Sequence, residues 1–371
     1  MRLLKRVRLA GWKSIKEQTI ELGPLNVLIG RNGSGKSNLI SFFKLLNEMF
    51  GRTPGLRAAV GTAEGADALL HFGSRQTPVA EIELTFETHG RDTSYYARWA
   101  AAAGGSLIFV DERCEYLKPG YPRPHVVSLG AGHSETGLIG KVEEGDKTAG
   151  ILLEHLRGCR LFHFHDTSAS SAIRKPSYIE ADRFLYPDGG NLASMLYLYQ
   201  QAHPAAYRRI LATVQQAVPD LTEFILEPRR LDPHNIVLKW RQRGKEYEFG
   251  AHQLSDGSIR FIALAALLLQ PASSLPLLIA LDEPELGLHP AALGLLAEMA
   301  KSASQQCQIL LATQSPVLLD AFDPGQVVVV DSRDGASEFR RLSSDNLSDW
   351  LEDYTLSEIW EKNVVGGGPY G

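Results

Sequence analysis

The first third of the chain alternates hydrophobic and polar residues in short runs, which is typical of β-strands. Residues 3–9 alternate with charged positions and predict a strand with one solvent-facing side, and residues 14–22 are its expected hairpin partner. The apolar run 25–30 predicts a short buried strand. Further strands are expected at 79–86, 95–99 and 106–114. Together these runs predict an antiparallel β subdomain.

Apolar residues at helical spacing dominate much of the remaining chain. Helices are expected at 38–48, at 149–156, at 192–218 with a break at Pro204, and at 254–269. Residues 160–165 predict a strand, and 224–249 predict a strand hairpin. The stretches 51–73, 118–146 and 166–175 are rich in small, glycine, proline or hydroxyl residues and are expected to be irregular, exposed or mobile.

A phosphate-binding loop is predicted between the strand at 25–30 and the helix that follows it. The run from Gly30 to Ser37 reads GRNGSGKS and fits the pattern G-x-x-x-x-G-K-[ST]. Glycines let the backbone approach a phosphate, and the N–H groups of the loop and the helix start converge on the anion. Lys36 is predicted to contact the β- and γ-phosphates, and Ser37 to ligate Mg²⁺.

Two further apolar strands end in polar residues that suit nucleotide hydrolysis. The strand at 277–282 delivers Asp282 and Glu283 to its carboxyl end, which is the Walker B arrangement. Asp282 is expected to hold the Mg²⁺ shell, and Glu283 to orient or deprotonate the attacking water. The strand from Ile309 ends at Gln314, and the ligands of open parallel sheets lie at that edge.

Composition describes an ordinary soluble globular protein. The 371 residues are 44% hydrophobic and 22% charged, with a net charge of −5, which gives no support for a surface that is basic overall. The three cysteines lack metal-ligand spacing and fit a reducing compartment. The N-terminus does not resemble a signal peptide, and no apolar run is long enough for a bilayer, so a cytoplasmic protein with no membrane partner is expected.

These motifs, in this order, resemble the ABC-type ATPase heads of the RecF, SMC and OLD families. GRNGSGKSN resembles their phosphate loop, LSDGS their signature, LDEPELGLHP their Walker B and D-loop, and ATQSP their switch strand. The resemblance implies an α/β P-loop NTPase of ABC-ATPase type that binds ATP with Mg²⁺. It further implies a homodimer that holds two ATP molecules between its protomers. The implied nucleotide contacts are Gly30, Asn32, Gly33, Ser34, Gly35, Lys36, Ser37 and Asn38 of one protomer with Ser255 and Gly257 of the other.

Within that resemblance, Glu283, Gln314 and Lys36 are the implied catalytic residues, and Ser37 and Asp282 the implied metal ligands. Gln314 stands where many such heads carry histidine. Long heptad arms and a TOPRIM nuclease domain are not expected. Families of this kind serve DNA repair, chromosome maintenance or anti-phage defence. The alternative is a regulatory gate that controls a separate effector protein, such as a nuclease or toxin, without binding DNA.

The expected organisation is one head interrupted by a lobe. Residues 1–149 and 225–345 are predicted to form the nucleotide-binding head, with a mixed or parallel sheet and the antiparallel subdomain. Residues 150–224 are predicted to form an inserted helical lobe. Residues 346–371 are predicted to form an amphipathic helix followed by a disordered glycine-rich end.

Several residues keep two interpretations at this stage. Ser255 either caps its own helix or contacts the partner's γ-phosphate. His163 and His165 are taken as structural in preference to metal ligands. Glu285 and His289 are expected to cap helices or contact a dimer partner. DNA contact and simple solvation both remain open for the basic residues before the signature, namely Arg229, Arg230, Arg241, Arg243 and Lys245.

Overall fold

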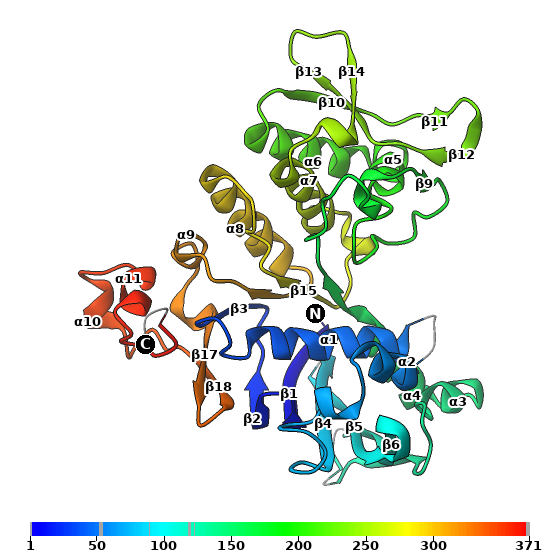
Figure 1. Ribbon diagram of the computed structural model, residues 1–371, viewed down its shortest axis with the longest axis vertical. Coiled ribbons are helices and arrows are strands. Elements are labelled where there is room, and N and C mark those ends of the chain that lie inside the picture. Colours follow the sequence, from blue (N-terminus) through cyan, green and yellow to red (C-terminus); the bar gives the residue numbers. More distant parts are fainter. Residues whose placement is uncertain (1, 52–54, 89, 118–119, 122, 369–371) are drawn as a thin grey trace.

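The computed structural model describes residues 2–51, 55–88, 90–117, 120–121 and 123–368. Two large sheets and a lobe make up the molecule (Figure 1). The antiparallel sheet has the spatial order β2 (Ile15–Glu21), β1 (Arg2–Trp12), β4 (Val79–Thr88), β5 (Arg91–Ala102), β6 (Ser106–Tyr116) and β7 (His125–Gly130). The predicted antiparallel subdomain is therefore present.

The core sheet is almost entirely parallel. Its order is β18 (Ala336–Arg341), β17 (Val327–Arg333), β3 (Leu25–Ile29), β16 (Gln308–Ala312), β15 (Leu278–Asp282) and β8 (Cys159–Phe162). β18 is the exception, since it runs antiparallel to β17. Most residues of the parallel strands are apolar and buried because both faces of the sheet are covered.

Alternation along the core strands separates two hydrophobic clusters. Ile279 and Leu281 of β15 join the cluster on one face, and Leu278 and Ala280 join the other. The second face packs against α1 (Lys36–Phe50), which lies between the core sheet and the antiparallel sheet together with α2 (Gly55–Thr62) and α4 (Lys147–Gly158). A short helix, α3 (Leu138–Glu143), precedes α4.

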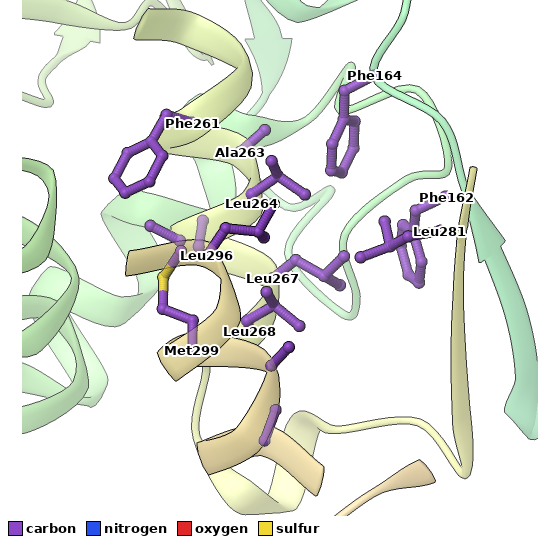
Figure 2. Packing of buried hydrophobic residues seen from close by; sticks show 14 of the residues in the cluster. Phe162, Phe164, Phe261, Ala263, Leu264, Leu267, Leu268, Leu281, Leu296 and Met299 are labelled. Atoms are coloured by element: carbon purple, nitrogen blue, oxygen red, sulfur yellow. The ribbon is translucent and has the colours of Figure 1, made fainter. Parts of the chain in front are cut away.

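The first face packs against α7 (Asp256–Leu268) and α8 (Pro290–Ser304). Figure 2 shows apolar side chains of these two helices gathered beside Phe162 of β8 and Leu281 of β15. The helix predicted at 254–269 and the strands predicted at 160–165 and 277–282 are observed as α7, β8 and β15. From Ile259 onward α7 is apolar almost all round because it is buried on every side.

The lobe lies above this face and mixes helices with two small sheets (Figure 1). Its helices are α5 (Leu192–Ala202) and α6 (Pro204–Ala217). One sheet has the order β10 (Leu221–Ile225), β13 (Lys239–Gln242) and β14 (Glu248–Gly250), and the other β11 (Pro228–Arg229), β12 (Asp232–Ile236) and β9 (Ser177–Tyr178). Short 3₁₀ helices cover Ala66–Ala68, Ala103–Gly105, Ala172–Arg174, Ala251–Gln253, Ala272–Ser274 and Pro324–Gln326.

The observed limits of the lobe differ from the predicted 150–224. β8 pairs with β15 in the core sheet, and α4 packs on α1 and the antiparallel sheet, so both belong to the head. The strands from β10 to β14 belong to the lobe instead. The short apolar run RLFHF carries no signal that distinguishes a core strand from a lobe strand.

Two of the predicted irregular stretches contain α-helices or strands. α2 lies within 51–73, where residues 52–54 are outside the described ones, and β7 and α3 lie within 118–146, where 118–119 and 122 are outside them. The single C-terminal helix is two short ones, α10 (Ser348–Leu351) and α11 (Leu356–Glu361), which follow α9 (Pro316–Leu319).

The glycine-rich end is ordered in part, contrary to the prediction. Trp360 Nε1 donates to Gly367 O at 2.7 Å, and Gly368 N donates to Asn363 Oδ1 at 2.9 Å. Residues 369–371 lie outside the described part of the chain.

Candidate functional site

The predicted phosphate loop connects β3 to α1 and follows a path that only glycine permits at two positions. A Cβ on residue 30 would lie 2.1 Å from Val330 O. Residue 35 has φ +111°, and a Cβ there would lie 2.0 Å from Ser337 Oγ. Gly30 and Gly35 therefore bring the loop against β17 and β18 more closely than any other residue could.

Hydroxyl and amide groups hold this loop in place. Asn38 Nδ2 donates to Ser14 Oγ at 2.6 Å, and the Ser14 and Ser337 hydroxyls share a hydrogen bond of 2.6 Å. Ser337 Oγ donates to Ser34 O at 2.7 Å. The side chain of Asn38 thus supports the loop, and its contact with a nucleotide stays a prediction. Asn32, Gly33 and Ser37 are exposed at the loop surface, whereas Ser34 is buried.

Lys36 is buried at the first position of α1, with 5% of the residue exposed. Its Nζ donates to the backbone oxygens of Gly30, at 2.5 Å, and Arg31, at 3.1 Å. Burial lowers the pKa of Lys36, while the charges of Glu283 and then Asp282 oppose that shift. The structure therefore brings the lysine of the first motif and the carboxylates of the second into one electrostatic neighbourhood.

Asp282 ends β15 as a half-buried residue, and one of its two carboxylate oxygens is fully buried. Its Oδ1 has no hydrogen-bond partner among the residues that the structure describes. Burial, and then the charge of Glu283, raise the pKa of Asp282. A buried carboxylate of this kind is costly unless a cation compensates it. Asp282 and the exposed hydroxyl of Ser37 are oxygen ligands that fit Mg²⁺, which usually takes few protein ligands.

Glu283 and Gln314 meet at the carboxyl ends of β15 and β16. Gln314 Nε2 donates to Glu283 Oε1 at 2.5 Å. Glu283 has φ +42°, a left-handed conformation that costs a glutamate about 1–3 kcal/mol and that often marks functional sites. A surface hollow of about 300 Å³ opens here, lined by Glu283, Glu285, Leu286, Gln314 and Ser315.

The neighbouring residues of the D-loop have structural contacts. Glu285 Oε1 accepts from Thr313 Oγ1 at 2.6 Å and from Gln314 N at 3.0 Å, so it ties the D-loop to the end of β16. His289 Nδ1 accepts from Ala291 N at 3.2 Å and caps α8. His165 Nε2 lies 2.9 Å from Asp282 O, which places this histidine beside the second motif.

Ser255 and Gly257 lie at the start of α7, on the lobe side of the core sheet. Ser255 Oγ accepts from Ser258 N at 3.1 Å, so the serine does cap its own helix. A Cβ on residue 257 would lie 2.3 Å from Gly287 O, so the signature packs closely on the D-loop of the same chain. Contact of either residue with a partner's nucleotide stays a prediction.

Two buried arginines that sequence reasoning missed fix this signature segment. Arg260 Nε donates to Phe164 O at 2.9 Å, its Nη2 to His165 O at 3.1 Å, and its Nη1 to Leu286 O. An arginine inside the apolar run SIRFIALAALLL was a signal that could have found it.

The second arginine, Arg174, comes from the stretch 166–175. It donates from Nη1 to Leu254 O at 3.0 Å and from Nη2 to Asp256 Oδ1 at 2.8 Å. Only 5% of its side chain is exposed. Nothing in the Ser/Thr-rich sequence around it pointed to this role.

The basic residues before the signature are split between two hairpins. Arg229 and Arg230 lie at the turn from β11 to β12, whereas Arg243 and Lys245 lie at the turn from β13 to β14. Arg241 forms an ion pair with Glu223. The basic residues before the signature therefore do not all lie on one hairpin.

Comparisons with known proteins show what the chain is similar to. Residues 142–320 match the family model described as "AAA domain, putative AbiEii toxin, Type IV TA system", and residues 6–115 match a model described as "AAA domain". The chromosome partition protein Smc of Mycoplasma genitalium is 34% identical over 131 residues, which are 32% of this chain and 13% of that protein. The chain thus spans only a small part of this curated relative.

Two solved structures resemble the whole chain. One is an SmcHead bound to the C-winged helix domain of ScpA, with TM-score 0.62, 18% identity, and coverage of 94% of this chain and 99% of that one. The other is an Smc head with an extended coiled coil bound to the C-terminal domain of ScpA, derived from Pyrococcus furiosus, with TM-score 0.58, 17% identity, and coverage of 95% and 99%. At these identities the two structures show that the chain has the fold of an Smc head domain, and the matched models add sequence similarity to AAA domains over residues 6–115 and 142–320.

Proposed function

We propose that this chain binds and hydrolyses ATP with Mg²⁺. The observation that carries the proposal is the meeting of Lys36, Asp282 and the Glu283–Gln314 hydrogen bond at the carboxyl edge of the parallel strands. Ligands of open parallel sheets bind at that edge. Lys36 provides a cation that can bind phosphate, Asp282 a carboxylate that can bind the metal ion, and Glu283 a carboxylate positioned to contact the attacking water.

The residues divide the chemistry between them. Lys36 exchanges its bonds to the Gly30 and Arg31 carbonyls for phosphate oxygens, and the N–H groups of the loop bind the same anion. Asp282 and Ser37 would hold Mg²⁺, and the bound ion would neutralise phosphate charge. Glu283 orients the attacking water and accepts its proton, while Gln314 holds the carboxylate in position.

The proposed cycle includes an ATP-dependent homodimer. Ser255 and Gly257 stand at the exposed N-terminal end of α7, whose N–H groups suit the γ-phosphate of a nucleotide bound to a second copy. Hydrolysis would release the contact and let the two lobes separate. No helix of the described residues is long and apolar enough to cross a membrane. A cytoplasmic location is part of the proposal.

Two roles for the ATPase differ in what stimulates it. One is action on DNA in repair, chromosome maintenance or anti-phage defence, which the likeness to Smc heads favours. The other is a gate for an effector protein, favoured by the toxin–antitoxin description of the matched model and by the ScpA domains bound to the two Smc heads.

Steady-state ATP hydrolysis, with and without linear duplex DNA at two salt concentrations, tests these roles. Glu283→Gln serves as the blank. Stimulation by DNA that fades as salt rises supports action on DNA, because phosphate contacts release counterions. A rate of ATP hydrolysis that is the same with and without DNA supports the role as a gate for an effector protein. Absence of any hydrolysis above the blank, with or without DNA, contradicts the ATPase itself.

A further inference from the structure

A second cavity lies at the opposite edge of the core sheet, where β8 and β15 begin. It has a volume of about 590 Å³. Its walls come from the end of α4, the start of β8, the loop before β15 and the segment around Arg183. The nucleotide-site residues follow the other ends of these strands, so this cavity is a separate place on the molecule.

The charges around the cavity are strongly one-sided. Its lining includes four arginines and one carboxylate, Glu154, which forms an ion pair with Arg2. The other three arginines, Arg157, Arg160 and Arg183, form no ion pair with any residue that the structure describes. The cavity therefore carries a surplus of positive charge in a protein whose net charge is −5.

Two of these guanidinium groups are already held in position. The Arg160 guanidinium lies 4.0 Å from the centroid of the Phe184 ring. Arg157 Nε donates to Phe50 O at 2.7 Å, and its Nη groups have no hydrogen-bond partner within the described ranges. Groups that are positioned before binding lose less conformational freedom when a ligand arrives.

Arg160 and Arg183 are also close enough to repel each other. Burial lowers the pKa of Arg160, and the charge of Arg183 lowers it further. Two like charges beside a partly buried cavity are unfavourable unless an anion lies between them. Guanidinium groups bind phosphate oxygens through pairs of parallel N–H bonds, so a phosphate is the anion that suits them best.

We propose that this cavity binds a phosphorylated small molecule of about nucleotide size. Its volume falls within the range of about 300–1,000 Å³ that is typical of small-molecule sites. Arg157, Arg160 and Arg183 bind the phosphate groups, and the apolar side chains of Leu153 and Leu277 contact the organic part. The site does not depend on the proposed ATPase activity, because none of these residues belongs to the nucleotide site.

Binding of inorganic pyrophosphate, measured by calorimetry, tests the site. All proteins in the series carry Lys36→Ala, which removes phosphate binding at the loop. We expect one saturable site, weakened about tenfold or more by Arg160→Gln combined with Arg183→Gln, since charge-assisted bonds are lost. Arg183→Gln alone, at an exposed position, is expected to weaken binding about threefold without affecting the fold.

Arg208→Gln is the matched control, because Arg208 is an exposed arginine on α6 in the lobe. Its affinity for pyrophosphate should equal that of the parent protein. Equal affinity in the Arg160/Arg183 variant, or no saturable binding in the parent, would overturn the proposal. So would binding of duplex DNA that needs these arginines while pyrophosphate does not bind, because the surface would then serve a polymer.

Discussion

The two faces of the core sheet hold their functional segments by different means. On the face of α1, the phosphate loop is fixed by short neutral hydrogen bonds among Ser14, Asn38 and Ser337. On the face of α7, the signature is fixed by Arg260 and Arg174, which reach main-chain oxygens of neighbouring segments. The phosphate loop is thus part of the sheet framework, whereas the signature depends on two long side chains. Substitutions at the first face should therefore change nucleotide binding. Substitutions at the second face should change the free energy of unfolding and the steps of the ATPase cycle that follow nucleotide binding.

Glu283→Gln should give the largest effect. The amide keeps the size of the side chain and can still accept from Gln314, but it cannot take a proton from water. ATP hydrolysis should fall about 1,000-fold, while ATP affinity stays within about threefold. Phosphate release and nucleotide titration measure the two quantities, and light scattering should detect dimer with ATP.

The control for that variant is Glu298→Gln, a change at an exposed glutamate of α8. It should hydrolyse ATP at the parent rate. If Glu283→Gln also keeps that rate, the general base lies elsewhere, and the strained backbone at residue 283 needs another explanation.

Lys36→Ala should weaken ATP binding by about 100-fold or more, because the charge-assisted bonds to the phosphates disappear. The glycine loop and its supporting hydroxyls remain, so the fold should not change. Lys44→Ala, at an exposed lysine of the same helix, is the control and should bind ATP normally. Equal affinity in the two variants would show that the face of α1 does not bind phosphate.

The contrast between the two faces also explains what the sequence could predict. The glycine loop, Asp282 and Glu283 are local patterns, each at the end of an apolar strand, and the structure brings Lys36 of that loop within electrostatic range of both carboxylates. Arg174 lies about eighty residues from the segment it holds, and that pairing arises only when the chain folds. The strand β8 was predicted, but its place in the core sheet depends on a partner more than a hundred residues away.

Arg260→Met tests the face of α7. Methionine preserves the apolar stem but removes the donors to Phe164 O, His165 O and Leu286 O, and the first of these carbonyls belongs to a buried residue. We expect a loss of about 2–3 kcal/mol in the free energy of unfolding, measured by denaturant titration. ATP affinity should stay within about threefold of the parent, because the phosphate loop is untouched.

The control is Arg208→Met, at an exposed arginine of the lobe, which should change stability by less than about 0.5 kcal/mol. If Arg260→Met weakens ATP binding as much as Lys36→Ala does, the two faces are coupled more tightly than the contacts indicate. The inference that the phosphate loop and the signature are held independently of each other would then be wrong.

Trp360→Phe should give the smallest effect, and it tests the segment where the two faces meet. Trp360 is buried in the cluster on the α7 face, yet its Nε1 holds Gly367, where an added Cβ would lie 3.6 Å from the Cα of Gly30 in the phosphate loop. Phenylalanine fills most of the same space and removes only the donor, so the free energy of unfolding should fall by about 1 kcal/mol. If the C-terminal segment from Trp360 to Gly367 (the tail) supports the phosphate loop, ATP affinity should also fall, by about two- to threefold.

Tyr354→Phe, at a partly exposed aromatic residue just before this segment, is the control and should change neither the free energy of unfolding nor the ATP affinity. A loss of stability with unchanged ATP affinity would mean that the tail covers the sheet without influencing the loop, and the two faces would then be separate as far as the nucleotide is concerned.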